Sequence, residues 1–409
     1  MRALIILGDD VASCLLAHIY RKIVRRGDVL LVARSEPIGY AHALLPYYSA
    51  GLVDTPQLIS RPLLELADLV RVIAWDHVEI RSPNELVVGG EAYSNPHLVI
   101  SAWPSCEPLK GRRVLSLETP EDAEVLKDFL SSGLEEAVVL GGAAALPLVD
   151  SLVRVGVKPT LVWGEGPFDS DVLSMLLEDL RAQGVKLAER LEEAPRDALH
   201  ISYAWGWAPQ YPRLGLAAPR ISVDKSCRVL GLSDVSAFGC ATEVVGPEGY
   251  THLVESEEEA MLQATSCALS LAGLEPLTAA RYFAARLGDK IYASLGLTQR
   301  EAERLSMKPA VTRIRGWGLR SSALIKLVAS RDARLIGAQL IVGAEAADLL
   351  GLLYYAICAK ASLHDLLCTL SPLDPSRPIL DTPLHHAFWA LLRKTALRRL
   401  ARELQRLEA

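Results

Sequence analysis

The apolar positions at the start of the chain follow a strand–helix–strand order. Residues 3–7 form a short apolar run, which is typical of a strand buried in a parallel sheet. Turn-forming residues follow at 8–10, and apolar residues at helical spacing then occupy 11–24. A second apolar run lies at 29–32. This order predicts a β-α-β unit, the opening of a doubly wound α/β sheet.

The same order returns later in the chain. An apolar run at 137–140 predicts a strand, and Gly141 and Gly142 predict a turn after it. Helical spacing then covers 143–155, and another apolar run lies at 160–163. Two such openings in one chain predict two dinucleotide-type domains.

Shorter elements fill the rest of the first two thirds. Alternating patterns predict strands at 70–80 and 85–88, and a buried strand is predicted at 98–100. Further strands are predicted at 199–203 and 221–223, and helices at 172–183 and 257–271. The proline-rich stretch 209–219 is typical of a linker.

The last third differs from this alternation. Two apolar strands at 323–330 and 334–342 are joined by three residues, which predicts a β-hairpin. Helices are predicted at 344–359 and, with a basic amphipathic pattern, at 388–407. We therefore expect a separate α+β domain at this end of the chain.

Composition narrows the class of protein. The chain has 409 residues, 50% of them hydrophobic, with 43 Lys and Arg against 49 Asp and Glu, a net charge of −6. This balance argues against nucleic-acid or anionic-membrane partners. Neither a signal peptide nor a membrane-spanning run is recognisable, and the seven cysteines form no metal-binding pair, so we expect no metal site and a cytoplasmic protein. Asparagine occurs only twice, which hints at a thermophilic source.

Four stretches match one known family in residue types, spacing and order. They are the strand pair 326–343, the segment 40–51, the turn 206–209 and the strand region 221–239. Together they resemble the pyridine nucleotide–disulfide oxidoreductases, especially the coenzyme A disulfide reductase and NADH oxidase branch. In that family these stretches belong to the dimerisation domain, the redox-cysteine segment, the end of the NADH domain and the return into the FAD domain.

The resemblance implies an α/β fold with two Rossmann-like domains, one inserted in the other, and a C-terminal α+β dimerisation domain. It assigns residues 1–108 and 219–302 to a discontinuous FAD-binding-like domain. Residues 109–218 become an NAD(P)-binding-like domain, and residues 303–409 the dimerisation-like domain. The implied cofactors are FAD and NAD(P)H.

The turn that would hold FAD departs from the family's three glycines. Gly8 keeps the first, but Asp10 and Ser13 replace the second and third. An Asp at a helix start caps the free N–H groups that would bind phosphates. Its charge, about 4 Å from a phosphate, would cost roughly 4 kcal/mol at an effective dielectric constant near 20. We expect helix capping here rather than phosphate binding.

Two further FAD positions also differ from the family. The resemblance aligns the family's ribose-binding acid with Ala33, and its Gly-Asp pair with Gly239 and Cys240. Trp103 stands where a glycine packs near the nucleotide, which suggests a filled cavity.

The second glycine turn shows similar losses. Gly141 and Gly142 keep part of it and are the candidate NAD(P)H contacts, but Ala143 and Leu146 replace the other two glycines. Trp163 takes the place of the acidic residue after the second strand. We expect Leu146 to push the helix from the strand or to force a different packing.

The redox cysteine of the family aligns with Ala43. Only a thiolate performs thiol–disulfide exchange, so disulfide reduction by the family mechanism is excluded unless another cysteine moves in. His42 could act as an acid or base, but we predict that it is a polar residue at a helix end with no catalytic role. Cys240 is expected to be a small buried residue.

Two functional hypotheses follow. The first is a degenerate, catalytically silent relative that works as a binding or dimerisation partner, as a homodimer or as a heterodimer with a paralogue through the C-terminal domain. The alternative is a flavin-dependent NAD(P)H oxidoreductase with an atypical cofactor site and no thiol chemistry. The losses at four ligand-contacting positions favour the first.

Overall fold

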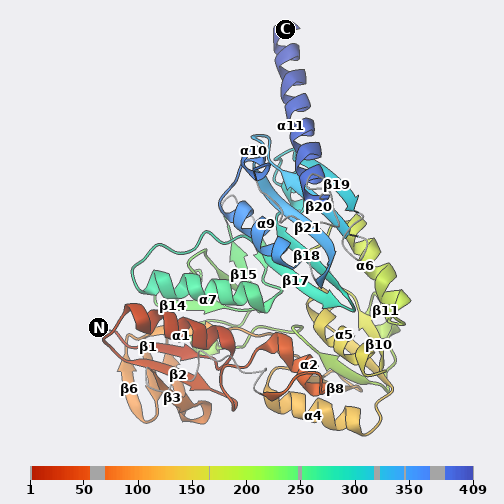
Figure 1. The fold of residues 1–409 in the computed structure, drawn as a ribbon. Helices are drawn as coiled ribbons and strands as arrows, with labels where there is room; N and C mark the ends of the chain where they lie inside the picture. Colours follow the sequence, from red (N-terminus) through yellow and green to blue (C-terminus); the bar gives the residue numbers. More distant parts are fainter. Residues whose placement is uncertain are drawn as a thin grey trace. The chain divides into compact units, whose positions relative to one another are not determined.

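The computed structural model describes residues 2–55, 70–164, 166–246, 251–316, 323–344, 347–368 and 383–408. The chain packs as two compact units, and each is described by itself (Figure 1). Unit 1 contains Met1–Gly166 and Arg181–Ala279, and unit 2 contains Pro167–Leu180 and Ala280–Ala409.

The first sheet of unit 1 is parallel throughout. Its strands, in spatial order, are β14 (Val235–Phe238), β7 (His97–Ser101), β1 (Leu4–Leu7), β2 (Val29–Ala33) and β3 (Arg71–Ala74). All four residues of β1 are buried, which is why this strand is a continuous apolar run in the sequence.

Two helices cover one face of this sheet. α1 (Val11–Ile23) and α7 (Glu257–Leu271) lie side by side and bury one apolar cluster against β1 and β2 (Figure 1). A small antiparallel sheet packs on the other face. It contains β4 (Val78–Ser82), β5 (Glu85–Val88) and β6 (Glu91–Ser94).

The second sheet of unit 1 is also parallel. Its order is β11 (Lys186–Ala188), β10 (Lys158–Val162), β9 (Glu136–Leu140), β12 (Leu199–Ser202) and β8 (Arg113–Ser116). Its strands all lie between β7 and β14 in the chain, so the second sheet is inserted in the sequence of the first. α4 (Pro120–Ser131) and α5 (Leu146–Arg154) pack on β8 and β10, and both contact α2 (Leu45–Ser49).

The helix predicted over 143–155 is wrong at its start. A 3-10 turn, η4 (Gly142–Ala145), comes first, and α5 begins only at Leu146. Leu146, the first residue of α5, is fully buried. Gly141 is required because a Cβ atom would collide with the carbonyl oxygen of Tyr203.

Two other predicted elements are interrupted. The strand predicted over 70–80 is broken by the 3-10 turn η3 (Trp75–His77) between β3 and β4. The predicted linker 209–219 contains η6 (Pro212–Leu214) and buries Leu214 in the first core. A third sheet joins β13 (Ile221–Val223), β15 (Thr242–Val245) and β16 (Thr251–Leu253), so β14 and not β13 returns to the first sheet.

Unit 2 is built on an antiparallel sheet. Its order is β17 (Tyr282–Leu287), β18 (Lys290–Gly296), β21 (Leu335–Gly343), β20 (Ala323–Ala329) and β19 (Ala310–Gly316). The predicted hairpin at 331–333 is confirmed as the link between β20 and β21. Since β17 and β18 belong to this sheet, it begins before residue 303.

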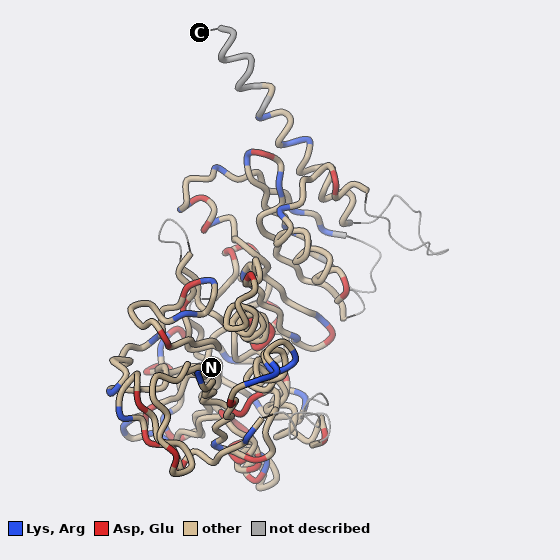
Figure 2. Tube along the Cα trace, turned by 90° about the vertical axis from the view of Figure 1, so that its left-hand side faces the viewer, with Lys and Arg blue, Asp and Glu red and all other residues tan. Residues whose placement is uncertain are grey.

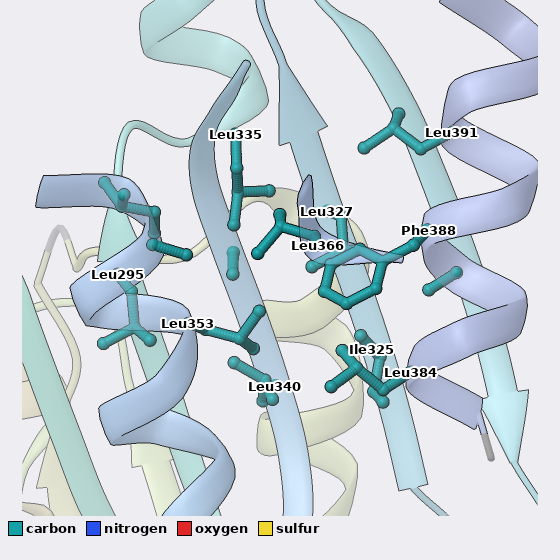
Figure 3. Close-up of a cluster of buried hydrophobic side chains, with 14 of the residues drawn as sticks. Leu295, Ile325, Leu327, Leu335, Leu340, Leu353, Leu366, Leu384, Phe388 and Leu391 are labelled. Atoms are coloured by element: carbon teal, nitrogen blue, oxygen red, sulfur yellow. The ribbon is translucent and has the colours of Figure 1, made fainter. Parts of the chain in front are cut away.

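Helices bury the apolar face of this sheet (Figure 3). α9 (Asp348–Cys358) contributes Leu353, and α11 (Pro383–Glu408) contributes Leu384, Phe388 and Leu391. The spacing of the α11 residues places them on one side of a helix. The helix predicted from 344 begins four residues later, and residues 345 and 346 lie outside the described part. The shorter helices of the unit are α8 (Gln299–Arg304) and α10 (Leu363–Leu366).

A buried lysine joins the N-terminal part of α6 (Ser170–Ala182) to this sheet. The Nζ atom of Lys326, on β20, lies 2.8 Å from a carboxylate oxygen of Asp169 and 2.8 Å from one of Asp171. Asp171 also pairs with Arg313 at 2.5 Å. Lys326 is fully buried, so it depends on these carboxylates for its charge to be tolerated.

The predicted fold class is confirmed: two parallel α/β sheets, one inserted in the other, precede a C-terminal α+β unit. The residue limits of the three domains remain predictions. Within the described ranges, no helix combines the length and apolar character needed to cross a membrane.

Candidate functional site

The first β–α turn is closed by its own side chains. Gly8 directly follows β1, and a Cβ atom there would collide with Ser13 and Ser101. Asp10 is the N-cap of α1: its Oδ1 accepts a hydrogen bond from the Ser13 amide at 2.7 Å. Its Oδ2 accepts one from the Ser101 hydroxyl at 2.5 Å. The expected capping role of Asp10 is therefore confirmed.

Asp9 ties the loop after β2 to this turn. Its Oδ2 accepts hydrogen bonds from the amides of Arg34 and Ser35 at 2.7 and 2.8 Å, and from the Ser35 hydroxyl at 2.9 Å. Its Oδ1 accepts one from the Tyr40 hydroxyl at 3.0 Å. Sequence reasoning missed this role, although two adjacent acidic residues in a glycine turn are an available signal.

A second carboxylate holds the segment that resembles the redox centre. Glu257, the first residue of α7, accepts hydrogen bonds from the amides of His42 and Ala43 at 2.7 and 2.9 Å. Both donors begin the 3-10 turn η1 (His42–Leu44). Glu257 was also missed, because nothing in the sequence pairs positions 215 residues apart.

His42 is buried among aromatic rings and carboxylates. Its ring stacks on Trp103 with centroids 3.8 Å apart and planes 6° apart. Its Nδ1 lies 3.6 Å from Glu257 and 3.9 Å from Asp10. His42 begins η1, as the expected polar helix-end residue would, and only 3% of it is exposed.

The surroundings of His42 favour its charged form. Burial is the largest single influence and lowers the pKa of His42, but Glu257 and Asp10 together outweigh it. The net effect raises the pKa above the ordinary value of 6.5. A protonated His42 between two carboxylates therefore contributes to the stability of this region.

The cavity left at this turn is small. Its volume is about 50 Å³, against roughly 300–1,000 Å³ for typical ligand pockets. Its wall includes Gly8, Asp10, His42, Trp103 and the guanidinium of Arg34, which lies 4.4 Å from the ring of Trp75. Trp103 thus occupies space beside His42, in line with the filled cavity expected from the sequence.

A larger cavity lies at the second glycine turn. Its volume is about 360 Å³, within the range of small-molecule sites. It contains both Gly141 and Gly142, so the structure brings these two predicted site residues into one pocket. The other residues that carry its chemistry are Trp163, Glu189, Arg190, Trp205, Arg220 and Cys240.

The sequence and the fold were compared with those of known proteins. No protein-family model matches the chain. It is 23% identical to an NADH oxidase from Methanocaldococcus jannaschii, over 90% of this chain and 93% of that protein. The water-forming NADH oxidase from Lactobacillus brevis is a structural match with a TM-score of 0.79 and 18% identity, over 97% and 100% of the two chains.

Two further solved structures have the same fold. A pyridine nucleotide–disulfide family oxidoreductase from Enterococcus faecalis matches 97% of this chain and 100% of its own, with a TM-score of 0.72 and 18% identity. The reduced CoADR-RHD of Bacillus anthracis matches 97% of this chain and 81% of its own, with a TM-score of 0.78 and 18% identity. The chain has the fold of the pyridine nucleotide–disulfide oxidoreductases. The resemblance predicted from the sequence is confirmed.

The first turn of this oxidoreductase fold does not fit FAD. The family's phosphate site needs free amides and an approachable backbone, but Asp10 already engages the Ser13 amide. The carboxylates of Asp9 and Asp10 both line the cavity at this turn and give it negative charge. The residues present therefore disfavour the cofactor that the fold implies.

None of the remaining predicted site residues supplies a reactive thiol. Ala43 offers only its backbone amide, which Glu257 engages. Gly239 has a φ of +111°, and a Cβ atom there would come within 2.7 Å of the Ala102 carbonyl oxygen. Cys240 is 4% exposed, as expected, and burial raises its pKa well above the ordinary value, so its thiol is a poor nucleophile.

Proposed function

We propose that this chain is a catalytically silent member of the oxidoreductase fold, which works by binding and not by electron transfer. The observation that carries the proposal is the Asp10 carboxylate, which caps α1 where the fold would hold a pyrophosphate. Ala43 supports it, because a methyl group replaces the sulfur that disulfide exchange requires. The small volume of the first cavity supports it as well.

Bound flavin decides between this proposal and its alternative. We expect the purified protein to be colourless, to release no flavin on denaturation, and to keep its melting temperature when FAD is added. Ligand binding to the native state would raise that temperature. A yellow protein whose visible absorbance disappears on reduction by NADH would overturn the proposal and favour the flavin-dependent NAD(P)H oxidoreductase.

A glycine-restored variant tests the role of the first turn. We expect the double variant Asp10→Gly, Ser13→Gly to gain measurable FAD affinity relative to the natural chain, because the capping carboxylate and the hydroxyl are both removed. Ser101 is left unchanged in this variant. Equal and strong FAD binding by the natural chain and the variant would show that Asp10 is no barrier.

The proposed partner is a second copy of the chain, joined through unit 2. α11 leaves large apolar side chains uncovered: Trp389 is 60% exposed, Leu397 56% and Leu400 54%. Leu400 lies three turns beyond Trp389, so the two share one side of the helix. On the same helix every charged residue up to position 400 is Lys or Arg (Figure 2). An isologous contact between two such apolar stripes would cover them.

Solution mass tests the partner. Light scattering during gel filtration should give a dimer for the natural chain and a monomer for Trp389→Glu. Leu230→Glu, at a position 50% exposed in unit 1, is the matched control and should stay dimeric. A monomeric natural chain at tens of micromolar would overturn self-association through α11.

A further inference from the structure

The two helices that cover the first sheet end on the same side of unit 1. Asp10, the N-cap of α1, and Glu257, the first residue of α7, lie 3.9 and 3.6 Å from the Nδ1 atom of His42. Since α1 and α7 begin at this one point and lie side by side, they run in the same direction. Their 13 and 15 residues correspond to lengths of about 20 and 22 Å, so their C-terminal ends also lie together.

Four cationic side chains gather where α1 ends. Arg21 and Lys22 lie in its last turn, where positive charge stabilises the end of a helix. Arg25 and Arg26 lie beyond the helix, and both are exposed. Neither of these two side chains makes a hydrogen bond or an ion pair with another residue that the structure describes. Helix stabilisation therefore accounts for the first two cations and not for the second two.

Two aliphatic side chains are exposed at the same ends of the helices. Ile23, the last residue of α1, is 40% exposed, and Leu274, just beyond α7, is 50% exposed. Only two carboxylates lie next to them in the chain, Asp28 and Glu275, so positive charge is in excess here. The helix-end patch consists of Arg21, Lys22, Ile23, Arg25, Arg26 and Leu274.

Positive charge around exposed aliphatic side chains favours the surface of an anionic bilayer. We propose that the helix-end patch binds a bilayer that contains anionic lipids. Its cations lie over the headgroups, and Ile23 and Leu274 enter the boundary with the acyl chains. The net charge of −6 opposes this contact only weakly, because salt screens charges beyond about 10 Å at 0.1 M ionic strength. Bilayer binding goes beyond the proposed function and does not depend on the absence of flavin.

Other anionic partners suit the aliphatic side chains less well. A nucleic acid offers phosphates to the arginines, but its bases are bound by hydrogen bonds and aromatic stacking, which Ile23 and Leu274 cannot supply. An acidic protein would need a surface shaped to fit both side chains. The boundary between headgroups and acyl chains accepts them without a shaped groove.

Sedimentation with lipid vesicles tests the patch. We expect the natural chain to sediment with vesicles of about 30% phosphatidylglycerol in phosphatidylcholine at about 0.1 M salt, and to stay in solution with pure phosphatidylcholine. Raising the salt to about 0.5 M should release it. The double variant Arg25→Ala, Arg26→Ala should bind about 30-fold more weakly, the effect of removing two cations from an anionic surface. Ile23→Ser with Leu274→Ser should weaken binding about tenfold through lost apolar burial.

The matched control is the double variant Arg196→Ala, Arg331→Ala. It removes the same charge from two exposed arginines outside the patch and should bind as the natural chain does. The arginine variants are also compared in the Trp389→Glu background, because α11 has exposed apolar side chains of its own. Melting temperatures without lipid must match among the variants, so that lost binding is not lost folding.

Four results would overturn bilayer binding through the patch. They are no sedimentation with the anionic vesicles, equal affinity for pure phosphatidylcholine, a patch arginine variant within about twofold of the control, and tighter binding to a DNA duplex or a glutamate-rich peptide than to the vesicles. Flavin release from the same samples tests the proposed function separately.

Discussion

Asp10→Ala removes two hydrogen bonds from one buried carboxylate. The lost cap to the Ser13 amide costs about 0.5–2 kcal/mol. The lost bond from the Ser101 hydroxyl, made to a charged acceptor, costs about 1.5–3 kcal/mol. The variant should therefore lose about 2–5 kcal/mol of unfolding free energy. At roughly 2–4 °C per kcal/mol for a domain of this size, its melting temperature should fall by at least about 4 °C.

Calorimetry measures this loss, and the first transition is compared because two units need not unfold together. Asp10→Asn is the matched variant, since asparagine also caps helices but carries no charge. We expect it to lose less than Asp10→Ala and to report only the charge interactions with Ser101 and His42. An Asp10→Ala protein within about 0.5 kcal/mol of the natural chain would refute the capping argument.

Three further outcomes follow from the structure. Because the pKa of His42 is raised in the fold, its stabilising charge is fully present below pH 6.5 and is lost as pH rises through the folded pKa, so urea unfolding from pH 6 to 9 should show a decline that His42→Gln lacks. Lys326→Met removes the buried cation from Asp169, while Asp171 keeps Arg313, and it should cost unit 2 about 3–5 kcal/mol by thermal unfolding, whereas a loss below about 1 kcal/mol would contradict the buried pairing. Gly141→Ala should cost at least about 1–3 kcal/mol from its collision with the Tyr203 carbonyl group, whereas Gly164→Ala, with no atom within 4 Å of its Cβ position, should be near neutral in the same assay.

Local sequence patterns were sufficient to predict many of the strands and helices of the fold. The apolar runs of β1, β2 and β9 and the helical spacing of α1 and α7 predicted those elements within one or two residues. Buried parallel strands need continuous apolar runs and amphipathic helices need one apolar side, so both signals are local. The capping by Asp10 was also predictable, because a cap acts within three residues of the chain.

Only the tertiary structure decided what surrounds the candidate sites. Glu257 meets His42 across 215 residues, and Trp103 stacks on the same ring from a third segment. Glu189 stands beside Trp163 because β10 and β11 pair in register. Sequence spacing sets which residues a strand or helix presents, whereas contacts between distant elements depend on how the sheets and helices pack, and these sites are made of such contacts.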